Sequence, residues 1–299
     1  MGDPRGIGPE VIRKALADRR GVVASAAKQS RFIIVGDKKI LGRVHPAVGV
    51  VDVPYKTAGE GSLKFLDRAI ALIKGGVADA LVTAPLSKEA VSRYHKNFVG
   101  HTEYLAEAFE VKNFDMMFIA NDVRLTIVTR HLPLKDVPKL ITQKAVFNSI
   151  ALMAGTLKDK FKIKNPKIAV LGLNPHAGEN GLLGHEDIKS ILPAIRKAQA
   201  QGINTNGPLP ADTFFAFKSP SLVQRGARGV HYDGIIAMYH DQGLAPLKGM
   251  YMKELVNFTA GLPFIRTSPA HGTAFDIAGK NKADPSSMQA ALKLACQLA

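Results

Sequence analysis

The chain has 299 residues, of which 46% are hydrophobic and 22% charged, a mixture typical of a packed globule with two ordinary domains or one large α/β unit. This composition excludes disorder, collagen and coiled coil, and no run of eighteen apolar residues exists to span a bilayer. The start lacks the features of a signal peptide and the single cysteine, Cys296, cannot form an internal disulfide, so we expect a cytoplasmic protein.

The net charge of +15, from 40 Lys+Arg against 25 Asp+Glu, would attract nucleic acid, acidic lipid or phosphorylated metabolites. The basic residues are scattered, with one dense stretch at residues 158–167 that we interpret as a solvated helix end and turn.

Short apolar runs alternate with longer amphipathic runs along the chain. In chain order, strands are predicted at 32–35, 80–82, 116–120, 125–128, 168–171 and 235–238, and helices at 63–73, 105–109, 145–157 and 188–200. Residues 2–10 are typical of a tight turn that delivers Pro9 to the first turn of a helix. The alternation predicts an α/β fold with a largely parallel sheet and helices on both faces.

Polar residues follow several of these predicted strands, where a parallel sheet binds its ligands. His131, His176 and His240 each come after a different strand, so the sheet could bring them into one crevice. Three neutral imidazoles suit a divalent metal such as Zn²⁺, and Asp212 is the best additional ligand. The alternatives are a capping or core hydrogen bond for each histidine, and a helix N-cap role for Asp212.

Two further stretches are candidates for binding an anion. His101 and Thr102 open a predicted helix, where backbone N–H groups can hold an anion, although Thr102 could simply cap that helix. Lys248 and Arg266 could clamp a phosphate, or could be two of many surface charges. Neither a Walker A motif nor a GxGxxG motif occurs, which disfavours an ATPase or an ordinary Rossmann dehydrogenase.

The chain resembles the 4-hydroxythreonine-4-phosphate dehydrogenase family of pyridoxal phosphate biosynthesis over nearly its whole length. The segments that carry the resemblance are Gly-Asp-Pro with Gly-Ile-Gly-Pro-Glu at residues 2–10, Thr-Ala-Pro-Leu-Ser-Lys at 83–88, Gly-His-Thr-Glu at 100–103, His-Leu-Pro-Leu at 131–134, Gly-Leu-Asn-Pro-His-Ala-Gly-Glu at 172–179, residues 207–212, Met-Tyr-His-Asp-Gln-Gly at 238–243, residues 261–268 and His-Gly-Thr-Ala at 271–274. Together these segments are far more specific than any single motif.

The resemblance implies a two-domain α/β fold similar to isocitrate and isopropylmalate dehydrogenases, with an active-site cleft between the domains. It assigns residues 1–99 with 260–299 to one domain and residues 100–259 to a second domain that carries the interface of a homodimer. It also implies a divalent metal, Zn²⁺, Mg²⁺ or Co²⁺, on His131, His176 and His240 with Asp212 near them, and one ligand crossing the dimer interface. The implied substrate-binding residues are His101, Thr102, Lys248, Asn257 and Arg266.

The implied activity is NAD(P)-dependent oxidation of 4-phosphooxy-L-threonine to 2-amino-3-oxo-4-phosphooxybutanoate, which decarboxylates to 3-amino-2-oxopropyl phosphate. A nearby base takes the proton of the metal-held hydroxyl, and Lys248, Asp241 and metal-bound water compete for that role. The segment that resembles the adenosine-binding loop of isopropylmalate dehydrogenases supplies the cofactor-binding residues His271, Gly272, Thr273, Ala274 and Asp276. A carboxylate at Asp276 accepts bonds from ribose hydroxyls and repels a 2′-phosphate, which favours NAD over NADP.

Related enzymes leave alternatives open. D-threonate or D-erythronate 4-phosphate could be the substrate. The three histidines could instead form a purely structural metal site. The chain could also belong to another class of protein, a basic nucleic-acid-binding protein without catalysis. The absence of tryptophan and of a recognised nucleic-acid motif argues against the last, and we expect no nucleic-acid or membrane partner. Family members place a strand before the Gly-Asp-Pro turn, so either residues precede Met1 or the sheet lacks that strand. Residues 219–232 are longer and more basic than the family leads us to expect.

Overall fold

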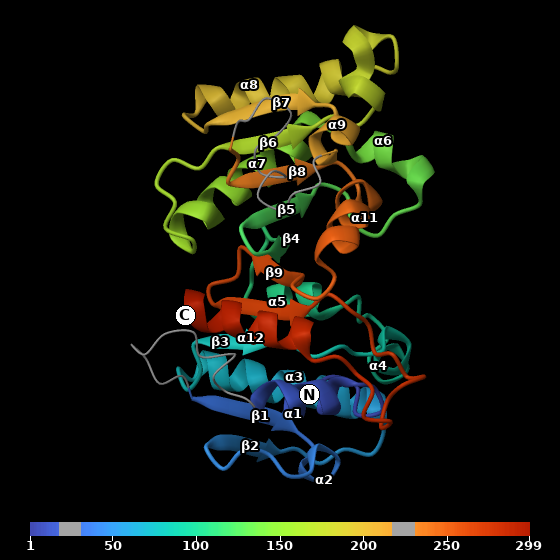
Figure 1. Ribbon diagram of the computed structural model, residues 1–299, viewed down its shortest axis with the longest axis vertical. Helices are drawn as coiled ribbons and strands as arrows, with labels where there is room; N and C mark the ends of the chain where they lie inside the picture. Colours follow the sequence, from blue (N-terminus) through green and yellow to red (C-terminus); the bar gives the residue numbers. More distant parts are fainter. Residues whose placement is uncertain (18–30, 217–230) are drawn as a thin grey trace. The chain divides into compact units, whose positions relative to one another are not determined.

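The computed structural model describes residues 1–17, 31–216 and 231–299, so most of the basic segment 219–232 lies outside the described residues. The chain forms two compact units (Figure 1): unit 1 comprises Met1–Lys112 and Lys253–Ala299, and unit 2 comprises Asn113–Met252. The division falls after residue 112 rather than after residue 99, because α5 (His101–Ala108) buries Leu105 in one cluster with Leu262 and Phe264 of unit 1. The prediction of a two-domain α/β chain is confirmed.

Unit 1 combines a pair of strands with a second, three-stranded group. Its strands are β1 (Phe32–Gly36), β2 (Val48–Asp52), β3 (Ala80–Val82), β9 (Val256–Ala260) and β10 (Ile265–Pro269). Strand β1 pairs in parallel with β2, while β10 pairs in parallel with β3 and antiparallel with β9. Besides α5, its helices are α1 (Gly8–Ala17), α2 (Lys38–Leu41), α3 (Ala58–Lys74), α4 (Lys88–Tyr94) and α12 (Ser286–Leu298).

Unit 2 carries strands in the order β4-β5-β8-β6-β7. These are β4 (Asp115–Ala120), β5 (Val123–Ile127), β6 (Ile168–Leu171), β7 (Thr205–Leu209) and β8 (Gly234–Ala237). Strands β4 and β5 are antiparallel, and the β5–β8, β8–β6 and β6–β7 pairs are parallel, so the expectation of a largely parallel sheet is confirmed here. The helices are α6 (Val137–Leu140), α7 (Gln143–Asp159), α8 (Leu192–Ala200), α9 (Ala211–Phe215) and α11 (His240–Tyr251).

Local sequence explains where the long helices begin. Thr57 caps α3 because its hydroxyl oxygen accepts a hydrogen bond from the Glu60 backbone N–H. The Glu60 carboxylate in turn accepts from the Thr57 backbone N–H, which makes a capping box. Thr142 caps α7 in the same way through the backbone N–H of Ala145. Among the described residues, no helix is long and apolar enough to cross a membrane.

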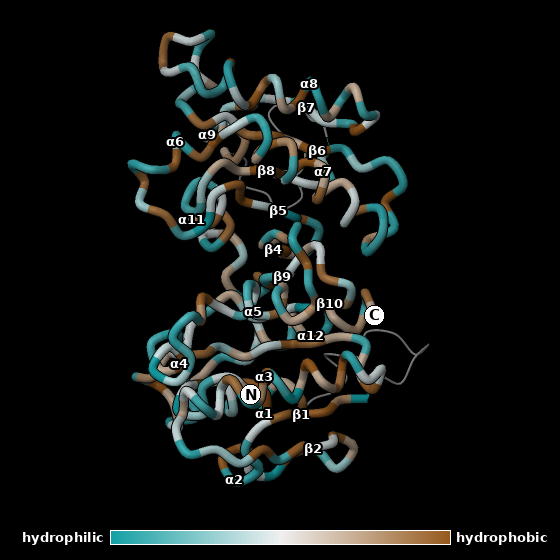
Figure 2. Tube along the Cα trace, turned by 180° about the vertical axis from the view of Figure 1, so that it is seen from behind, coloured by the Kyte–Doolittle hydropathy of each residue, from teal (hydrophilic) through white to brown (hydrophobic). Residues whose placement is uncertain are grey.

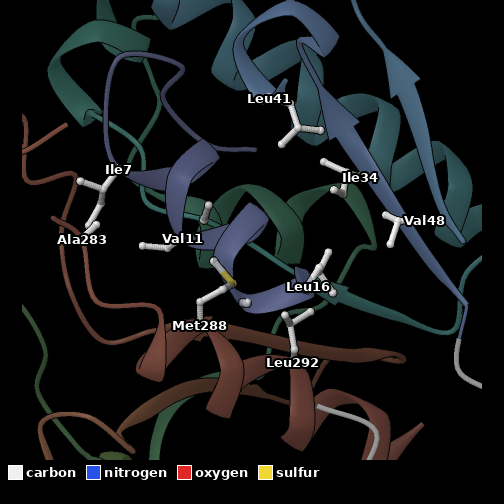
Figure 3. Close-up of a cluster of buried hydrophobic side chains, with 11 residues drawn as sticks. Ile7, Val11, Leu16, Ile34, Leu41, Val48, Ala283, Met288 and Leu292 are labelled. Atoms are coloured by element: carbon white, nitrogen blue, oxygen red, sulfur yellow. The ribbon is translucent and has the colours of Figure 1, made fainter. Parts of the chain in front are cut away.

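The most buried strands are apolar, whereas the partly exposed strands β2 and β7 include glycine, proline or polar residues. Figure 2 shows β1 and β8 coloured mainly as hydrophobic, and every residue of β6 and β8 is buried. In unit 1, Figure 3 shows Met288 and Leu292 of α12 directed toward Val11 and Leu16 of α1, with Ile34 of β1 in the same cluster. This packing fixes the turn before α1 against the rest of unit 1.

The sheet of unit 2 also fixes where its histidines emerge. Strands β5, β8 and β6 are adjacent and parallel, so the segments that follow them leave from one edge of the sheet. Those segments carry His131, His240 and His176 respectively.

Candidate functional site

Two of the candidate metal ligands lie beside each other. The backbone N–H of Thr129 donates to Met238 O at 3.1 Å and its hydroxyl donates to the same oxygen at 2.7 Å, which ties the end of β5 to the end of β8. His131 and His240 follow these two strand ends, and their ring centroids are 5.5 Å apart, with the rings tilted by 42°. Two imidazoles at this separation can approach one ion or substrate group.

His176 sits in a left-handed turn, a conformation that L residues adopt at a cost. Residues 176–180 all have positive φ, including His176 at 53°, Ala177 at 54° and Glu179 at 41°. Each non-glycine residue in this region costs on the order of 1 kcal/mol, and such strain is concentrated at functional sites. The turn places His176 Nδ1 at 2.5 Å from Glu179 Oε1, and this bond raises the pKa of His176.

A buried carboxylate and an amide hold the strand ends that carry these histidines. Asp187, only 1% exposed, accepts hydrogen bonds from the backbone N–H groups of Leu173 and Asn174, just before the His176 turn. Gln242 accepts from the Met238 backbone N–H at 2.7 Å and donates to Gly172 O at 2.7 Å. Gln242 therefore links the His240 segment to the His176 segment.

The donor chemistry of these histidines fits a metal such as Zn²⁺. His240 Nδ1 lies 2.7 Å from Asp241 Oδ1 and His176 Nδ1 bonds Glu179, so a carboxylate orients each ring and leaves Nε2 for a ligand. The negative charge of Asp212, which lies in α9, raises the pKa of His176 by less than Glu179 does. Pro210, and not Asp212, occupies the N-cap of α9. Within the described residues of one chain, no three His, Cys, Asp or Glu side chains form a metal-binding group. The structure brings His131 and His240 together, and Asp212 acts electrostatically on His176.

The two candidate proton carriers share α11 with His240. Asp241 is 83% exposed at its side chain and is the second residue of the helix, whereas Lys248 lies about two turns further on and is half-buried. A spacing of seven residues puts both on one side of the helix. The structure thus aligns Lys248 with Asp241, and both belong to unit 2.

Arg266 is the most unusual charged residue in unit 1. Its side chain is 2% exposed, and its guanidinium donates to hydroxyl groups alone: Thr83 Oγ1 at 2.7 Å, Thr259 Oγ1 at 3.0 Å and Thr102 Oγ1 at 3.5 Å. Its Nε has no hydrogen-bond partner among the described residues. Burial lowers the pKa of Arg266 to about 10, which still leaves it charged at neutral pH. The negative charge of Glu103 acts in the opposite direction on this pKa. A buried cation that bonds neutral hydroxyls is suited to an anionic ligand.

The start of α5 lies next to this arginine. Thr102 is 5% exposed and accepts from Arg266, and no side chain caps the helix, so the alternative that Thr102 caps α5 is wrong. Burial holds the pKa of His101 well below its usual value, and the positive charges of Arg266, the Met1 amino group and Lys88 lower it further. A neutral His101 can therefore donate or accept a hydrogen bond beside the helix N-terminus.

Asn257 completes the unit 1 set. It lies on β9, opposite Ser268 of β10, and its Oδ1 is buried without a hydrogen-bond partner among the described residues. Buried polar atoms that lack partners are rare in folded proteins and often mark a place where a ligand or water binds. His101, Thr102, Asn257 and Arg266 all belong to unit 1, and Lys248 belongs to unit 2.

The candidate cofactor loop is an open turn rather than a helix start. Ala274 has a positive φ of 42° and its carbonyl accepts from the Ile277 backbone N–H, while Asp276 is exposed and α12 begins only at Ser286. Asp276 therefore does not cap a helix. The end of this loop, at Ala278, Gly279 and Asn281, lines a cavity of about 440 Å³ together with Arg5 and Arg13.

Sequence reasoning left four positioning residues without a role. Glu179 orients His176, and Asp187 supports the turn in which His176 lies. Gln242 joins two strand ends, and Thr259 accepts a hydrogen bond from Arg266. Glu179 and Gln242 lie within three residues of a candidate ligand, so proximity could have indicated them. Asp187 and Thr259 act across the fold, and no local pattern marks them.

Comparison with known proteins gives one consistent result. The family model for "Pyridoxal phosphate biosynthetic protein PdxA" matches residues 12–295. The chain is 38% identical to a 4-hydroxythreonine-4-phosphate dehydrogenase from Sulfurihydrogenibium sp., and 40% identical to a putative D-threonate 4-phosphate dehydrogenase from Oceanobacillus iheyensis. Both alignments cover 100% of this chain and 96% of the relative. A crystal structure of 4-hydroxythreonine-4-phosphate dehydrogenase from Klebsiella pneumoniae matches with a TM-score of 0.80 and 35% identity, covering 100% of this chain and 97% of that one.

Proposed function

This chain belongs to the family of the pyridoxal phosphate biosynthetic protein PdxA, and from that premise we propose that it is a dehydrogenase that oxidises the secondary hydroxyl of 4-phosphooxy-L-threonine. The reaction transfers a hydride to C4 of the nicotinamide of NAD, and the resulting 2-amino-3-oxo-4-phosphooxybutanoate loses CO₂ to give 3-amino-2-oxopropyl phosphate. The substrate carries a phosphate, a carboxylate and an ammonium group. The site must therefore hold two anionic groups at once.

One observation carries the proposal more than any other: the buried guanidinium of Arg266 bonds three threonine hydroxyls and is 2% exposed. Glu103 acts on this charge electrostatically, while the hydrogen bonds of the guanidinium described above go to neutral hydroxyls. Burying a charge is expensive, and a phosphate that binds there would lower that cost. Thr102 and His101 at the start of α5 add a hydroxyl, an imidazole and backbone N–H groups to the same place. We assign substrate phosphate binding to Arg266, Thr102, His101 and Asn257.

The reacting end of the substrate is assigned to the histidines of unit 2. His131, His176 and His240 would hold a divalent metal with Asp212 near them, and that metal, when bound, supplies Lewis acidity that lowers the pKa of the substrate hydroxyl. Glu179 and Asp241 keep the His176 and His240 rings oriented by accepting from Nδ1. Lys248 orients the substrate as a cation and, with Asp241, is the candidate that takes the hydroxyl proton.

We assign the adenosine half of NAD to the loop that carries His271, Gly272, Thr273, Ala274 and Asp276. Asp276 is exposed, so its carboxylate can accept bonds from the two ribose hydroxyls and would repel a 2′-phosphate. We expect kcat/KM with NAD to exceed kcat/KM with NADP, and Asp276→Lys to shift the ratio toward NADP. Equal efficiency with the two cofactors, or an unchanged ratio in Asp276→Lys, would contradict this assignment.

The deciding experiment is an assay of NADH release by the purified, metal-loaded protein. 4-Phosphooxy-L-threonine should be turned over. 4-Hydroxy-L-threonine, which lacks the phosphate, should lose at least about 100-fold in kcat/KM because it forgoes the charge-assisted bonds to the buried arginine. Arg266→Lys keeps the positive charge but loses the planar guanidinium that can donate two parallel hydrogen bonds to a phosphate. It should therefore raise KM for the phosphorylated substrate more than it changes kcat. No NADH release with any phosphorylated hydroxy acid would refute the proposal.

A second substrate has support from a specific observation. The relative named a putative D-threonate 4-phosphate dehydrogenase is 40% identical over the whole chain, about as similar as the 4-hydroxythreonine-4-phosphate dehydrogenases. D-threonate and D-erythronate 4-phosphate place a phosphate on the same framework, so Arg266 would serve them equally. The assay should therefore include both acids, and the higher kcat/KM identifies the substrate.

A further inference from the structure

The turn before α1 lies directly against the candidate cofactor loop. The Ile7 backbone N–H donates to Thr273 O at 2.9 Å. A Cβ on Gly6 would meet the same oxygen at 2.9 Å, so only a glycine allows the turn and the loop to approach this closely. The backbone N–H of Asp3 donates to Pro85 O at 2.9 Å, beyond the end of β3. The turn is therefore anchored on the rest of unit 1 and can support the loop.

A buried carboxylate of this turn fixes the side chain of Arg5. Asp3 is 0% exposed and accepts three hydrogen bonds from Arg5: from the backbone N–H at 3.0 Å, from Nε at 3.1 Å and from Nη2 at 2.9 Å. Two hydrogen bonds between a guanidinium and a carboxylate set the orientation of the arginine as well as pairing its charge. The Arg5 side chain is thus held in one position although it is 58% exposed.

The guanidinium of Arg5 lies over the ring of Phe275 in the cofactor loop, with 5.5 Å between Cζ and the ring centroid. This distance is in the range of a cation–π attraction. Asp3 occupies the edge of the guanidinium that carries Nε and Nη2, while the ring meets its face. Arg5 therefore connects a buried group of the turn to an exposed residue of the loop.

Phe275 lies at the exposed tip of the loop, next to Asp276. The residues that flank this tip, Ala274, Ile277 and Ala278, pack against the core cluster around α1. Phe275 and Asp276 are exposed between them, and Phe275 is 48% exposed. Ala274 has a positive φ of 42°, a conformation that alanine adopts at a cost. The contact with Arg5 stabilises the tip in this conformation from outside the loop.

We propose that Arg5 is a positioning residue for the dinucleotide cofactor, because it holds the loop tip, through Phe275, in the conformation that presents the Asp276 carboxylate to the ribose. Since the proposed function assigns the adenosine half of NAD to this loop, the role of Arg5 rests on that function. A loop that is ordered beforehand loses less entropy when the cofactor binds. An exposed cation–π contact supports an effect of about two- to fivefold on cofactor affinity.

The alternative is a direct contact between Arg5 and a phosphate of the cofactor. The two roles differ in how they depend on Phe275. A phosphate contact would persist without the ring, so the effects of substituting Arg5 and Phe275 would add. A role through the ring predicts that the two effects do not add, because either substitution breaks the same link.

The test compares the parent chain with Arg5→Gln, Phe275→Leu and the double variant. Glutamine keeps a side-chain donor for Asp3, so the buried carboxylate retains a partner. Titration of NADH fluorescence without substrate should give a Kd about two- to fivefold above that of the parent for each single variant, and no further increase for the double variant.

Two other substitutions are controls for charge. Arg5→Lys keeps a cation that can pair with Asp3 and lie over the ring, and should bring the Kd for NADH to within about twofold of the parent value. Arg43→Ala removes an exposed arginine of unit 1 and should leave the Kd unchanged, which excludes a general attraction of the anionic cofactor.

Two readouts separate positioning from a loss of stability. KM for NAD should rise in Arg5→Gln and Phe275→Leu, while kcat and KM for the phosphorylated hydroxy acid stay within about twofold of the parent. In the chain without cofactor, the Ile277 amide should exchange at least about threefold faster in both variants, with an unfolding midpoint within about 2 °C of the parent.

The outcomes distinguish this role from the proposed function itself. A parent chain that does not bind NADH would contradict the proposed function, and the role of Arg5 with it. A parent that binds NADH, together with an unchanged Kd in Phe275→Leu, additive effects in the double variant or unchanged exchange of Ile277, would overturn the role of Arg5 alone.

Discussion

Arg266 and His101 show how single side chains acquire properties that their residue types do not have in water. Burial lowers the pKa of Arg266 to about 10 and holds the pKa of His101 well below its usual value, and Arg266 itself contributes to the second effect. The fold therefore keeps the imidazole neutral beside a cation that stays charged. An anion that binds there meets the charge of Arg266 and a neutral imidazole that can donate a hydrogen bond.

The histidine assignment makes the first prediction at this scale. His131→Ala should abolish metal-dependent turnover and lower the bound metal per chain, while circular dichroism and the unfolding midpoint change little, because His131 is exposed. His45→Ala, an exposed histidine of unit 1, is the matched control and should keep both activity and metal. Full activity in His131→Ala would refute the metal assignment.

Asp115 makes a prediction on pH. Burial raises the pKa of Asp115 to about 6, against the favourable effects of Arg130, the Met116 backbone N–H and the Ser149 hydroxyl. The pKa of Asp115 is higher in the folded chain than in the unfolded chain, so between about pH 4 and 6 the folded chain holds a proton on Asp115 that the unfolded chain has lost. The free energy of unfolding therefore falls as the pH rises through this range, because the Asp115 carboxylate becomes charged while buried.

Asp115→Asn should therefore stabilise the chain at pH 7.5 by about 1 to 3 kcal/mol, since Ser149 can still donate to the amide oxygen. The gain should shrink toward zero at pH 4. Urea unfolding at the two pH values measures it, with Asp122→Asn, on an exposed turn residue, as the control. A variant that is less stable at pH 7.5 would show that the pairing with Arg130 outweighs the burial.

At the scale of elements, the ends of three parallel strands decide where the chemistry of unit 2 lies. Thr129 links β5 to β8, Gln242 links α11 to the end of β6, and Asp187 supports the segment before His176. The left-handed turn that follows β6 is strained at several non-glycine residues, and these hydrogen bonds are what hold it. The histidines are thus positioned by backbone contacts rather than by each other.

Gln242 tests this interpretation. Gln242→Ala removes both hydrogen bonds and should cost about 1 to 2 kcal/mol of stability and weaken Zn²⁺ binding at least severalfold, because His240 and His176 lose their common support. Gln201→Ala, at the exposed end of α8, should change neither quantity. Zn²⁺ affinity equal to that of the parent chain would show that Gln242 stabilises the fold without positioning the ligands.

On the scale of the whole molecule, the candidate residues divide between the units. Unit 1 supplies the buried arginine, its hydroxyl partners and the candidate cofactor loop, and unit 2 supplies the histidines, Asp241 and Lys248. The proposed reaction needs both sets. The net charge of +15 is larger than these roles require. Lys248 and Arg266 have specific roles in the proposed reaction, and the other basic residues that make up the excess have none.

The proposed metal site, with a ligand from a second subunit, predicts a homodimer. Light scattering after gel filtration at micromolar concentration should give twice the chain mass of 32.1 kDa. His131 and His240 lie beside each other in one chain, so the ligand from the second subunit is assigned to His176. Mixing two inactive variants, His131→Ala and His176→Ala, should therefore restore part of the activity, because the mixed dimer contains one site with all three histidines intact. A monomer at these concentrations, with full activity, would contradict the dimer.

The sequence by itself determined the class of fold, the position of six of the ten described strands and that of the long helices α3 and α7. Alternation of short β-branched runs with amphipathic ones predicted β1, β3, β4, β5, β6 and β8, since buried parallel strands must be apolar throughout. It did not indicate β2, β7, β9 or β10, in which glycine, proline or polar residues interrupt the apolar pattern. Propensity is local, whereas these strands are stabilised by their neighbours.

Only the tertiary structure decided which polar residues act together. Thr83, Thr102, Thr259 and Arg266 are up to 183 positions apart in the chain, and their hydrogen bonds exist because β3, β9, β10 and α5 pack in one unit. The burial that shifts the pKa values of Arg266, His101 and Asp115 likewise depends on packing, which no sequence pattern contains.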